Sequence, residues 1–185
     1  MAVAPIPEPA AVVPIEITRM RRRHLRRVLS IEGQVYPRPW SASLFLSELT
    51  QRATRSYLVA RHRGDVVGYA GMMFTGFEAH VTNIAVDPNW HGKKVGSRLL
   101  ISLITEAIAR GCSRLSLEVR VSNRGAQAMY HKFGFEGTGV RRGYYIETNE
   151  DALIMVVDDA TTTEYRLLLQ RLRNEVTGTL EVGDD

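Results

Sequence analysis

The sequence predicts an α/β (α+β) domain with a mixed, mostly antiparallel central sheet of about seven strands and helices on both faces. The first observation is the order of segments, which reads strand, two helices, three strands, helix, strand, helix and two strands. The second is the apolar spacing, which alternates between a period of about 2, typical of strands, and about 3.6, typical of helices. The third is that short hairpins coexist with a long crossover helix, so antiparallel and parallel strand pairs share one sheet.

The first half of the chain contains four expected strands and two expected helices. Ser41 is placed to cap the second helix, directly after Pro39 and Trp40. A hairpin turns at residues 63–65. We expect strands over 15–20, 55–62, 66–74 and 78–86, and helices over 21–33 and 41–50.

The second half contains the most regular helix. Apolar residues recur on one helical face from Val95 to Ile108, and Gly111 closes the segment. A strand from residue 115 alternates apolar and polar residues, with Glu118 on its polar face. We also expect a helix that Ser122 and Asn123 cap and Gly134 ends, strands over 135–146 and 152–157, and a helix beyond Asp159 with Tyr165, Leu168, Leu169 and Leu172 on one face.

The length of 185 residues and the 44% hydrophobic content are typical of one globular domain. We expect a disordered Ala/Pro-rich tail over 1–14, the domain itself over 15–158, and an extra helix with an acidic tail over 159–185. The tail lacks the basic start of a signal peptide, and no run of 18 apolar residues occurs, so no membrane partner is expected. The single cysteine, Cys112, agrees with a cytoplasmic location.

Positive charge is concentrated near the start of the expected domain. The net charge is +4, and six arginines fall within residues 19–27. We expect a solvated helix face there, with Leu25, Val28 and Leu29 turned to the core. Binding of phosphate-rich or acidic partners is the alternative. Because no aromatic residue interleaves the arginines, direct nucleic-acid binding through this Arg19 to Arg27 patch is only a secondary hypothesis.

The segment NIAVDPNWHGKKVGSRLL, residues 83–100, has the layout of an anion site. A strand ends at Asp-Pro, a loop follows that contains two glycines and two lysines, and a long helix begins. Free amide groups and the positive end of the helix dipole attract phosphate oxygens there. Neither GxxxxGK[ST] nor GxGxxG is present, and an ordinary helix entry is the alternative.

These motifs together resemble one family. NIAVDPxW with its basic glycine loop, followed by LEVRxSNxxAxxMYxxFGF, is similar to the GNAT superfamily of acetyl-CoA-dependent N-acetyltransferases. More narrowly, the chain resembles the ribosomal-protein alanine N-acetyltransferases, and the resemblance runs from about Ile15 to Val157. It also includes EGQVYPRPWS at 32–41, RRGYY at 141–145 and EDALIM at 150–155.

The resemblance implies a sheet that is splayed between its fourth and fifth strands, with acetyl-CoA as co-substrate in the gap. No metal is implied. The backbone of Ile84, Ala85 and Val86 would bind the pantetheine arm, and Asn123 would meet the cofactor from the other side. The pyrophosphate would lie on Gly92, Lys93, Lys94, Val95, Gly96 and Ser97.

One residue departs from the family loop, which usually reads Q/R-x-x-G-x-G. Lys94 stands at the first of these glycines. Because a side chain is tolerated at low cost only where φ is negative, we expect an ordinary backbone conformation at Lys94.

Direct acetyl transfer needs a base that frees the amine and a donor for the departing thiolate. Glu118 is our candidate base and Tyr130 our candidate acid, and the family implies the same two positions. The alternative for Glu118 is a structural ion pair with Arg120 or Arg141. The alternative for Tyr130 is a core-facing helix aromatic.

Other polar and aromatic residues are weaker candidates. The resemblance suggests that Tyr36, Tyr144 and Tyr145 contact the acceptor peptide, with ordinary packing as the alternative. His80 and His91 are alternative bases, but neither has a partner at a recognisable spacing.

Three functions compete. The leading hypothesis is a monomeric or weakly dimeric Nα-acetyltransferase that acts on the N-terminal amine of a protein, such as a ribosomal protein. The second is an acetyltransferase for lysine side chains or small amines. The third is a non-catalytic acetyl-CoA-binding or ribosome-associated module that uses the Arg19 to Arg27 patch.

Overall fold

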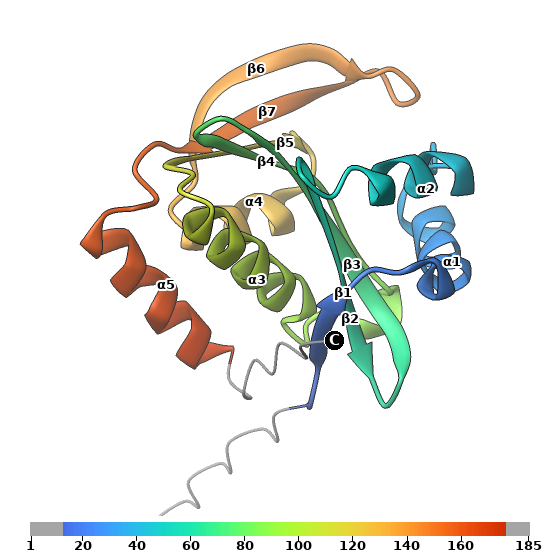
Figure 1. The fold of residues 1–185 in the computed structure, drawn as a ribbon. Helices are drawn as coiled ribbons and strands as arrows, with labels where there is room; N and C mark the ends of the chain where they lie inside the picture. The colour runs from blue at the N-terminus through green and yellow to red at the C-terminus, as the bar shows by residue number, and fades with distance from the viewer. Residues whose placement is uncertain (1–12, 177–185) are drawn as a thin grey trace, which may run out of the picture.

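The computed structural model describes residues 13–176, which form one seven-stranded sheet with helices on both faces (Figure 1). The strand order is β1-β2-β3-β4-β5-β7-β6. Every neighbouring pair is antiparallel except β4 and β5, which are parallel. The mixed, mostly antiparallel sheet is therefore confirmed. Residues 1–12 of the Ala/Pro-rich tail expected over 1–14, and the acidic end over 177–185, lie outside the described residues.

The elements follow the expected order along the chain. The first helix begins as a short 3-10 turn and continues past Gly33, so its expected end was two residues too early. The strands are β1 Glu16–Arg19, β2 Arg55–His62, β3 Asp65–Thr75, β4 Glu78–Val86, β5 Arg114–Arg120, β6 Glu136–Tyr145 and β7 Glu150–Val157. The helices are η1 Arg22–His24, α1 Leu25–Val35, α2 Ala42–Thr50, η2 Pro88–Trp90, α3 Val95–Ala109, α4 Arg124–Lys132 and α5 Thr163–Glu175.

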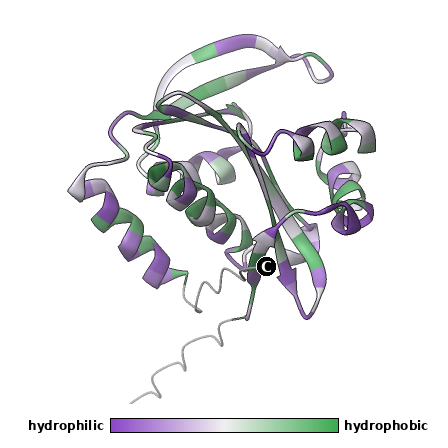
Figure 2. Cartoon of the chain, viewed as in Figure 1, coloured by the Kyte–Doolittle hydropathy of each residue, from purple (hydrophilic) through white to green (hydrophobic). Residues whose placement is uncertain are grey.

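Two hydrophobic clusters hold the helices to the sheet. On one face, α1 and α2 pack on β2 and β3 through Val28, Ile31, Phe45 and Tyr69, which are fully buried. On the other face, α3, α4 and α5 form a larger cluster, and Figure 2 shows hydrophobic residues along α3. The arginines at 21–23 and Arg26 are exposed while Leu25 and Val28 are buried, so the expected orientation of this helix is confirmed.

The helix α5 packs on the same core as the preceding elements. Its Tyr165 donates a hydrogen bond of 3.0 Å to the carbonyl oxygen of Phe133. The buried Arg98 of α3 donates to the carbonyl oxygens of Val13 at 3.1 Å and Val176 at 3.0 Å. One guanidinium thus holds the first and last described segments against α3.

The sheet opens between β4 and β5. Their pairing runs from Glu78 with Arg114 to Val81 with Leu117 and then stops. Beyond that point β4 continues along β3 to Val86, whereas β5 continues along β7 to Arg120. The expected splay between the fourth and fifth strands is therefore confirmed. None of the helices in the described part of the chain is long and apolar enough to cross a membrane.

Candidate active site

A cleft of about 410 Å³ lies at the point where β4 and β5 separate. Its walls come from both halves of the sheet, from α4, from the β6–β7 hairpin and from the connection between α1 and α2. Seven residues expected at the site from the sequence line this one cleft. They are Tyr36, Ile84, Glu118, Asn123, Tyr130, Tyr144 and Tyr145.

The other expected cofactor residues lie beyond the cleft, along the end of β4 and the start of α3. Ala85 turns its side chain to the α1 face, while Val86 packs on the α3 side. A Cβ atom at Gly96 would lie 3.7 Å from Val86 and 3.6 Å from the sulfur of Met129. The N-terminus of α3 therefore lies between the end of β4 and α4, in continuation of the gap. An open strand edge that leads to a helix N-terminus fits an extended ligand with a phosphate group.

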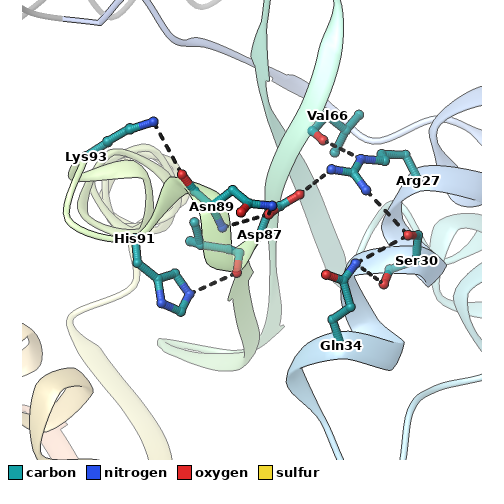
Figure 3. Close-up of polar contacts among 9 residues, drawn as sticks. Arg27, Ser30, Gln34, Val66, Asp87, Asn89, His91 and Lys93 are labelled. Atoms are coloured by element: carbon teal, nitrogen blue, oxygen red, sulfur yellow. Dashed lines mark hydrogen bonds and ion pairs between the residues drawn. The ribbon is translucent and has the colours of Figure 1, made fainter.

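Asp87 anchors the loop that follows β4. Its carboxylate accepts hydrogen bonds from the backbone amide of Asn89 at 2.9 Å and from the Asn89 side chain at 3.1 Å, and it pairs with Arg27 of α1 (Figure 3). Burial disfavours the charged carboxylate, but the Asn89 amide and the Arg27 guanidinium outweigh this effect and lower the pKa of Asp87. Asp87 thus joins α1 to the start of the loop.

The two loop lysines differ in their surroundings. Lys93 lies over the ring of Trp90, with Nζ 4.4 Å from the ring centroid. Its Nζ also donates to the carbonyl oxygen of Asn89 at 3.3 Å (Figure 3). Lys94 donates from Nζ to the carbonyl oxygen of Glu175 at 2.9 Å. Its charge therefore lies at the C-terminus of α5, a favourable end of the helix dipole for a cation.

The expected ordinary backbone at Lys94 was wrong. Lys94 has φ +58° and ψ 22°, which is the left-handed conformation that a glycine adopts without steric cost. A side chain in this conformation costs about 1 kcal/mol or more. The contact with Glu175, which the sequence pattern did not reveal, offsets part of that cost.

Glu118 has two charged or titratable partners in the cleft. Its Oε1 lies 3.3 Å from Nη1 of Arg141, so the ion pair considered as its alternative role is present. Its Oε2 lies 3.0 Å from Nε2 of His80. Arg120 instead pairs with Glu147 at 2.5 Å and Glu150 at 3.2 Å. With its side chain only 9% exposed, Glu118 is held in place and still borders the cleft.

Tyr130 belongs to both the core and the cleft. Its ring packs edge-on against Phe135 with centroids 5.8 Å apart, and the residue is 8% exposed. Burial raises the pKa of Tyr130, so its hydroxyl is protonated at neutral pH. The phenol can therefore donate a hydrogen bond inside the cleft while its ring is fixed by packing.

The three expected substrate tyrosines lie on opposite walls. Tyr36 donates to the carbonyl oxygen of Ile84 at 2.9 Å. Tyr144 and Tyr145 form an edge-on pair with centroids 5.1 Å apart, and the Arg120 guanidinium lies 3.8 Å from the Tyr145 ring centre. Burial raises the pKa of Tyr145 to about 12.

Two features of the cleft were not predicted from the sequence, namely the contact of His80 with Glu118 and the buried carboxyl group of Glu32. His80 had no recognisable partner in the sequence, because its contact with Glu118 depends on how β4 and β5 align. Glu32 is 1% exposed, and its Oε1 accepts from the Trp40 amide at 2.9 Å. Burial raises the pKa of Glu32, which also lines the cleft. Polar residues at alternate positions of two neighbouring strands were the available signal for His80.

Comparisons with known proteins agree with this geometry. The family model described as "Acetyltransferase (GNAT) family" matches residues 25–135. N-alpha-acetyltransferase RimI of Mycobacterium tuberculosis (strain ATCC 25618 / H37Rv) is 37% identical over 148 residues, covering 77% of this chain and 91% of that protein. [Ribosomal protein bS18]-alanine N-acetyltransferase of Escherichia coli (strain K12) is 36% identical over 143 residues, covering 76% of this chain and 95% of that protein.

A solved structure shares the fold. The crystal structure of the ribosomal-protein-S18-alanine N-acetyltransferase from Escherichia coli has a TM-score of 0.73 and 33% identity, and the match covers 82% of this chain and 97% of that one. The family match includes β4, the glycine loop, α3, β5 and α4, which border the gap between β4 and β5. The chain belongs to the acetyltransferase (GNAT) family.

Proposed function

We propose that this chain is a cytoplasmic Nα-acetyltransferase that transfers the acetyl group of acetyl-CoA to the N-terminal amine of a protein. Relatives that are 36–37% identical over most of their length support this, because their names specify N-alpha acetylation or ribosomal protein bS18-alanine acetylation. We therefore propose the N-terminal alanine of a bS18-type ribosomal protein as the acceptor. We expect residues 15–158 to be the acetyltransferase domain and residues 159–185 an addition to it.

The observation that carries the proposal is that Glu118 and Tyr130 line one cleft where the sheet has opened. In our assignment, the pantetheine arm pairs with the edge of β4 at Ile84, Ala85 and Val86. The pyrophosphate lies at Gly92 to Ser97, beside the first turn of α3. Asn123, whose side-chain oxygen caps α4 at Ala126 N, borders the opposite side of the gap.

The assigned chemistry balances without a covalent enzyme intermediate. The cationic amine first loses one proton, which Glu118 accepts. The neutral nitrogen then attacks the thioester carbon, the C–S bond breaks, and a second proton leaves the nitrogen as the thiolate becomes a thiol. At pH 7 an α-amino group is deprotonated at a cost of about 1 to 1.4 kcal/mol, and a lysine at about 4.6 kcal/mol. A carboxylate such as Glu118 is therefore a sufficient proton acceptor for an N-terminus. Tyr130 donates a hydrogen bond to the departing sulfur.

The acceptor peptide enters between the two substrate walls. Tyr36 lies on one wall, and Tyr144 and Tyr145 lie on the other. The carboxylate of Glu118 borders the cleft and favours a cationic amine beside it.

An acetylation assay with matched peptides tests the proposal. The substrate is a peptide that begins with alanine and contains one internal lysine, and the comparison is the same peptide with its N-terminus blocked. We expect mass spectrometry to show acetylation of the free N-terminus only. Acetylation of the blocked peptide or of polyamines at a higher rate would reject the Nα assignment in favour of a lysine or small-amine enzyme.

A variant at Glu118 separates catalysis from coenzyme A binding. We expect Glu118→Gln to reduce kcat at least 100-fold while coenzyme A still binds, since the glutamine cannot accept the proton. Binding of coenzyme A without turnover by the unmodified chain would instead indicate the non-catalytic module.

A further inference from the structure

Glu118 is one end of a continuous series of polar contacts that crosses from β5 to β4. Its Oε2 lies 3.0 Å from Nε2 of His80. The other ring nitrogen, Nδ1, lies 2.9 Å from Oγ of Ser116. Ser116 in turn donates a hydrogen bond of 2.8 Å to Oε1 of Glu78. The series therefore leads from the cleft to Glu78, whose side chain is 41% exposed.

Strand register produces this series. His80 pairs directly with Ser116 in the parallel ladder, so Glu78, His80, Ser116 and Glu118 alternate onto one face of the sheet. The last pair before the gap is Val81 with Leu117. Glu118 is thus the first residue of β5 beyond the paired region. His80, which lies one residue before the last paired residue of β4, contacts it there.

The hydrogen atoms in the series can be counted. The hydroxyl of Ser116 has one hydrogen, which it donates to the Glu78 carboxylate, so Ser116 accepts from Nδ1–H of His80. Nε2 of His80 then has either a lone pair or a second hydrogen. A lone pair facing an ionised Glu118 makes no hydrogen bond, whereas one added proton between these two atoms completes the series. The contact between Oε2 of Glu118 and Nε2 of His80 can therefore hold one added proton, next to the substrate amine that must lose one.

We propose that His80 is a positioning residue that takes from Glu118 the proton removed from the substrate amine and, once protonated at Nε2, holds the Glu118 carboxylate by a hydrogen bond. This inference rests on the proposed function and extends it. An N–H bond of the amine breaks as an O–H bond forms at Glu118, and that O–H bond then breaks as an N–H bond forms at Nε2. The Nδ1 proton can move to Ser116 as the hydroxyl proton moves to Glu78, from which it leaves to water.

General acid–base chemistry favours such a second acceptor. In model peptides an α-amino group titrates roughly 3 to 4 pH units above a glutamate carboxyl, but only roughly 1 to 2 units above an imidazole. Transfer of the proton onward to an imidazole is therefore less unfavourable than leaving it on the carboxylate. Other groups that face the series are Arg141 at 3.3 Å from Glu118, Arg114 at 3.9 Å from Glu78, and Tyr144 beside Glu118.

The test measures acetylation of the alanine peptide between pH 6 and pH 10 for His80→Gln and for a control, His131→Gln. His131 is an exposed residue of α4, and glutamine at position 80 can still donate a hydrogen bond to Glu118 but cannot titrate. We expect H80Q to lower kcat about tenfold near pH 7, with an unchanged KM for acetyl-CoA. The deficit should shrink above pH 9, where the amine is already neutral. H131Q should match the unmodified enzyme throughout.

A structural role alone predicts a different result. If H80Q were slower by the same factor at every pH, or within twofold of the unmodified enzyme at pH 7, the inference would be overturned. If the unmodified enzyme fails to acetylate the peptide, the proposed function is rejected, and the role of His80 needs a separate measurement. Nitrogen-15 NMR of the imidazoles then tests the inference, because Glu118→Gln should change the Nε2 resonance of His80, which lies 3.0 Å from Glu118, and leave that of His131 unchanged. An unchanged His80 Nε2 resonance would overturn it.

Discussion

The hydroxyl of Tyr36 donates a hydrogen bond of 2.9 Å to the carbonyl oxygen of Ile84, on the edge of β4 that β5 has left. The carbonyl oxygen of Val86, two residues further along the same edge, lies 3.2 Å from Nε2 of His91. Side chains from two different loops therefore contact the backbone where a sheet neighbour would otherwise pair. A partly buried strand edge without such contacts would leave polar groups unsatisfied.

Replacing Tyr36 with phenylalanine tests whether the cofactor uses the same carbonyl. We expect Y36F to lower the free energy of unfolding of the free protein by about 1 kcal/mol, since the Ile84 carbonyl loses its donor. With saturating coenzyme A the loss of unfolding free energy in Y36F should fall below about 0.5 kcal/mol, because a pantetheine amide supplies a donor to the Ile84 carbonyl. Urea unfolding with and without coenzyme A measures both values.

The matched control is Tyr165→Phe, which removes a hydrogen bond of similar length to the carbonyl oxygen of Phe133, outside the cleft. Its stability loss should be the same with and without coenzyme A. A Y36F deficit that persists in coenzyme A would show that the cofactor does not take the Ile84 carbonyl.

Tyr130→Phe should lower kcat by about 10- to 100-fold with little change in the KM for acetyl-CoA. The phenol acts on the sulfur as charge develops there, so its loss affects the transition state more than cofactor binding. Steady-state kinetics with varied acetyl-CoA separates the two parameters. Y165F should keep the full kcat, and an equal loss in both variants would mean that Tyr130 acts only through packing.

The pair of Arg27 and Asp87 should make stability depend on pH. The pKa of Asp87 is lowered in the folded protein, so its contribution is present above the unfolded pKa of about 3.9 and is lost as pH falls through the folded value. We expect Arg27→Ala to cost about 1 kcal/mol at pH 7, a modest value because the Arg27 side chain is 41% exposed. The loss of unfolding free energy in R27A should decrease as the pH falls from 5 to 2, because Asp87 is protonated over this range.

Arg27→Lys is the control for charge at this site. It keeps the cation but loses the hydrogen bond from the Arg27 Nε atom to the carbonyl oxygen of Val66. We expect its loss at pH 7 to be smaller than that of R27A, as measured by urea unfolding at each pH. Equal losses at pH 7 and pH 2 for R27A would contradict a role for the Asp87 charge.

Two substitutions at Lys94 separate backbone strain from the side-chain contact. Both Lys94→Ala and Lys94→Gly remove the hydrogen bond to Glu175, but only glycine relieves the positive φ. We therefore expect K94G to be more stable than K94A by about 1 kcal/mol. Equal free energies of unfolding would mean that the left-handed conformation is not retained in solution.

Gly71 lies at the irregularity where β3 meets the part of β4 that borders the gap. A Cβ atom there would lie 2.3 Å from Tyr57, 2.6 Å from Thr82 and 2.7 Å from Asn83. We expect Gly71→Ala to cost about 2 kcal/mol or more, since these neighbours are held by strands. Gly33→Ala, inside α1 with no atom within 4 Å of the new Cβ, should instead stabilise the protein by about 0.5 to 1 kcal/mol.

Local sequence signals predicted most of the elements. Ser41 caps α2 by accepting from the Leu44 amide at 3.2 Å, and Asn123 caps α4 through the Ala126 amide at 3.1 Å. Such contacts join residues three positions apart and need no knowledge of the fold. The candidate pair Glu118 and Tyr130 was also within reach of the sequence, because strand alternation and a motif that resembles a known family both single them out.

The conformation of Lys94 could not be inferred in the same way. Its left-handed φ accompanies a hydrogen bond to Glu175, which is 81 positions away. The contact of Glu118 with His80 could not be predicted either, since the register of β4 against β5 decides whether His80 faces Glu118 or a hydrophobic neighbour. A shift of one residue would turn that side chain to the other face.

The sequence by itself thus determined the order of the elements, their caps and the carboxylate and phenol of the candidate site. Periodicity and capping depend on residues within one or two turns of the chain. Only the tertiary structure decided that Tyr36 covers the edge of β4 and that His80 connects Glu118 to Ser116. These hydrogen bonds of Tyr36 and His80 join residues 48 and 36 positions apart. Contacts of that range depend on strand register and helix packing, which no local pattern encodes.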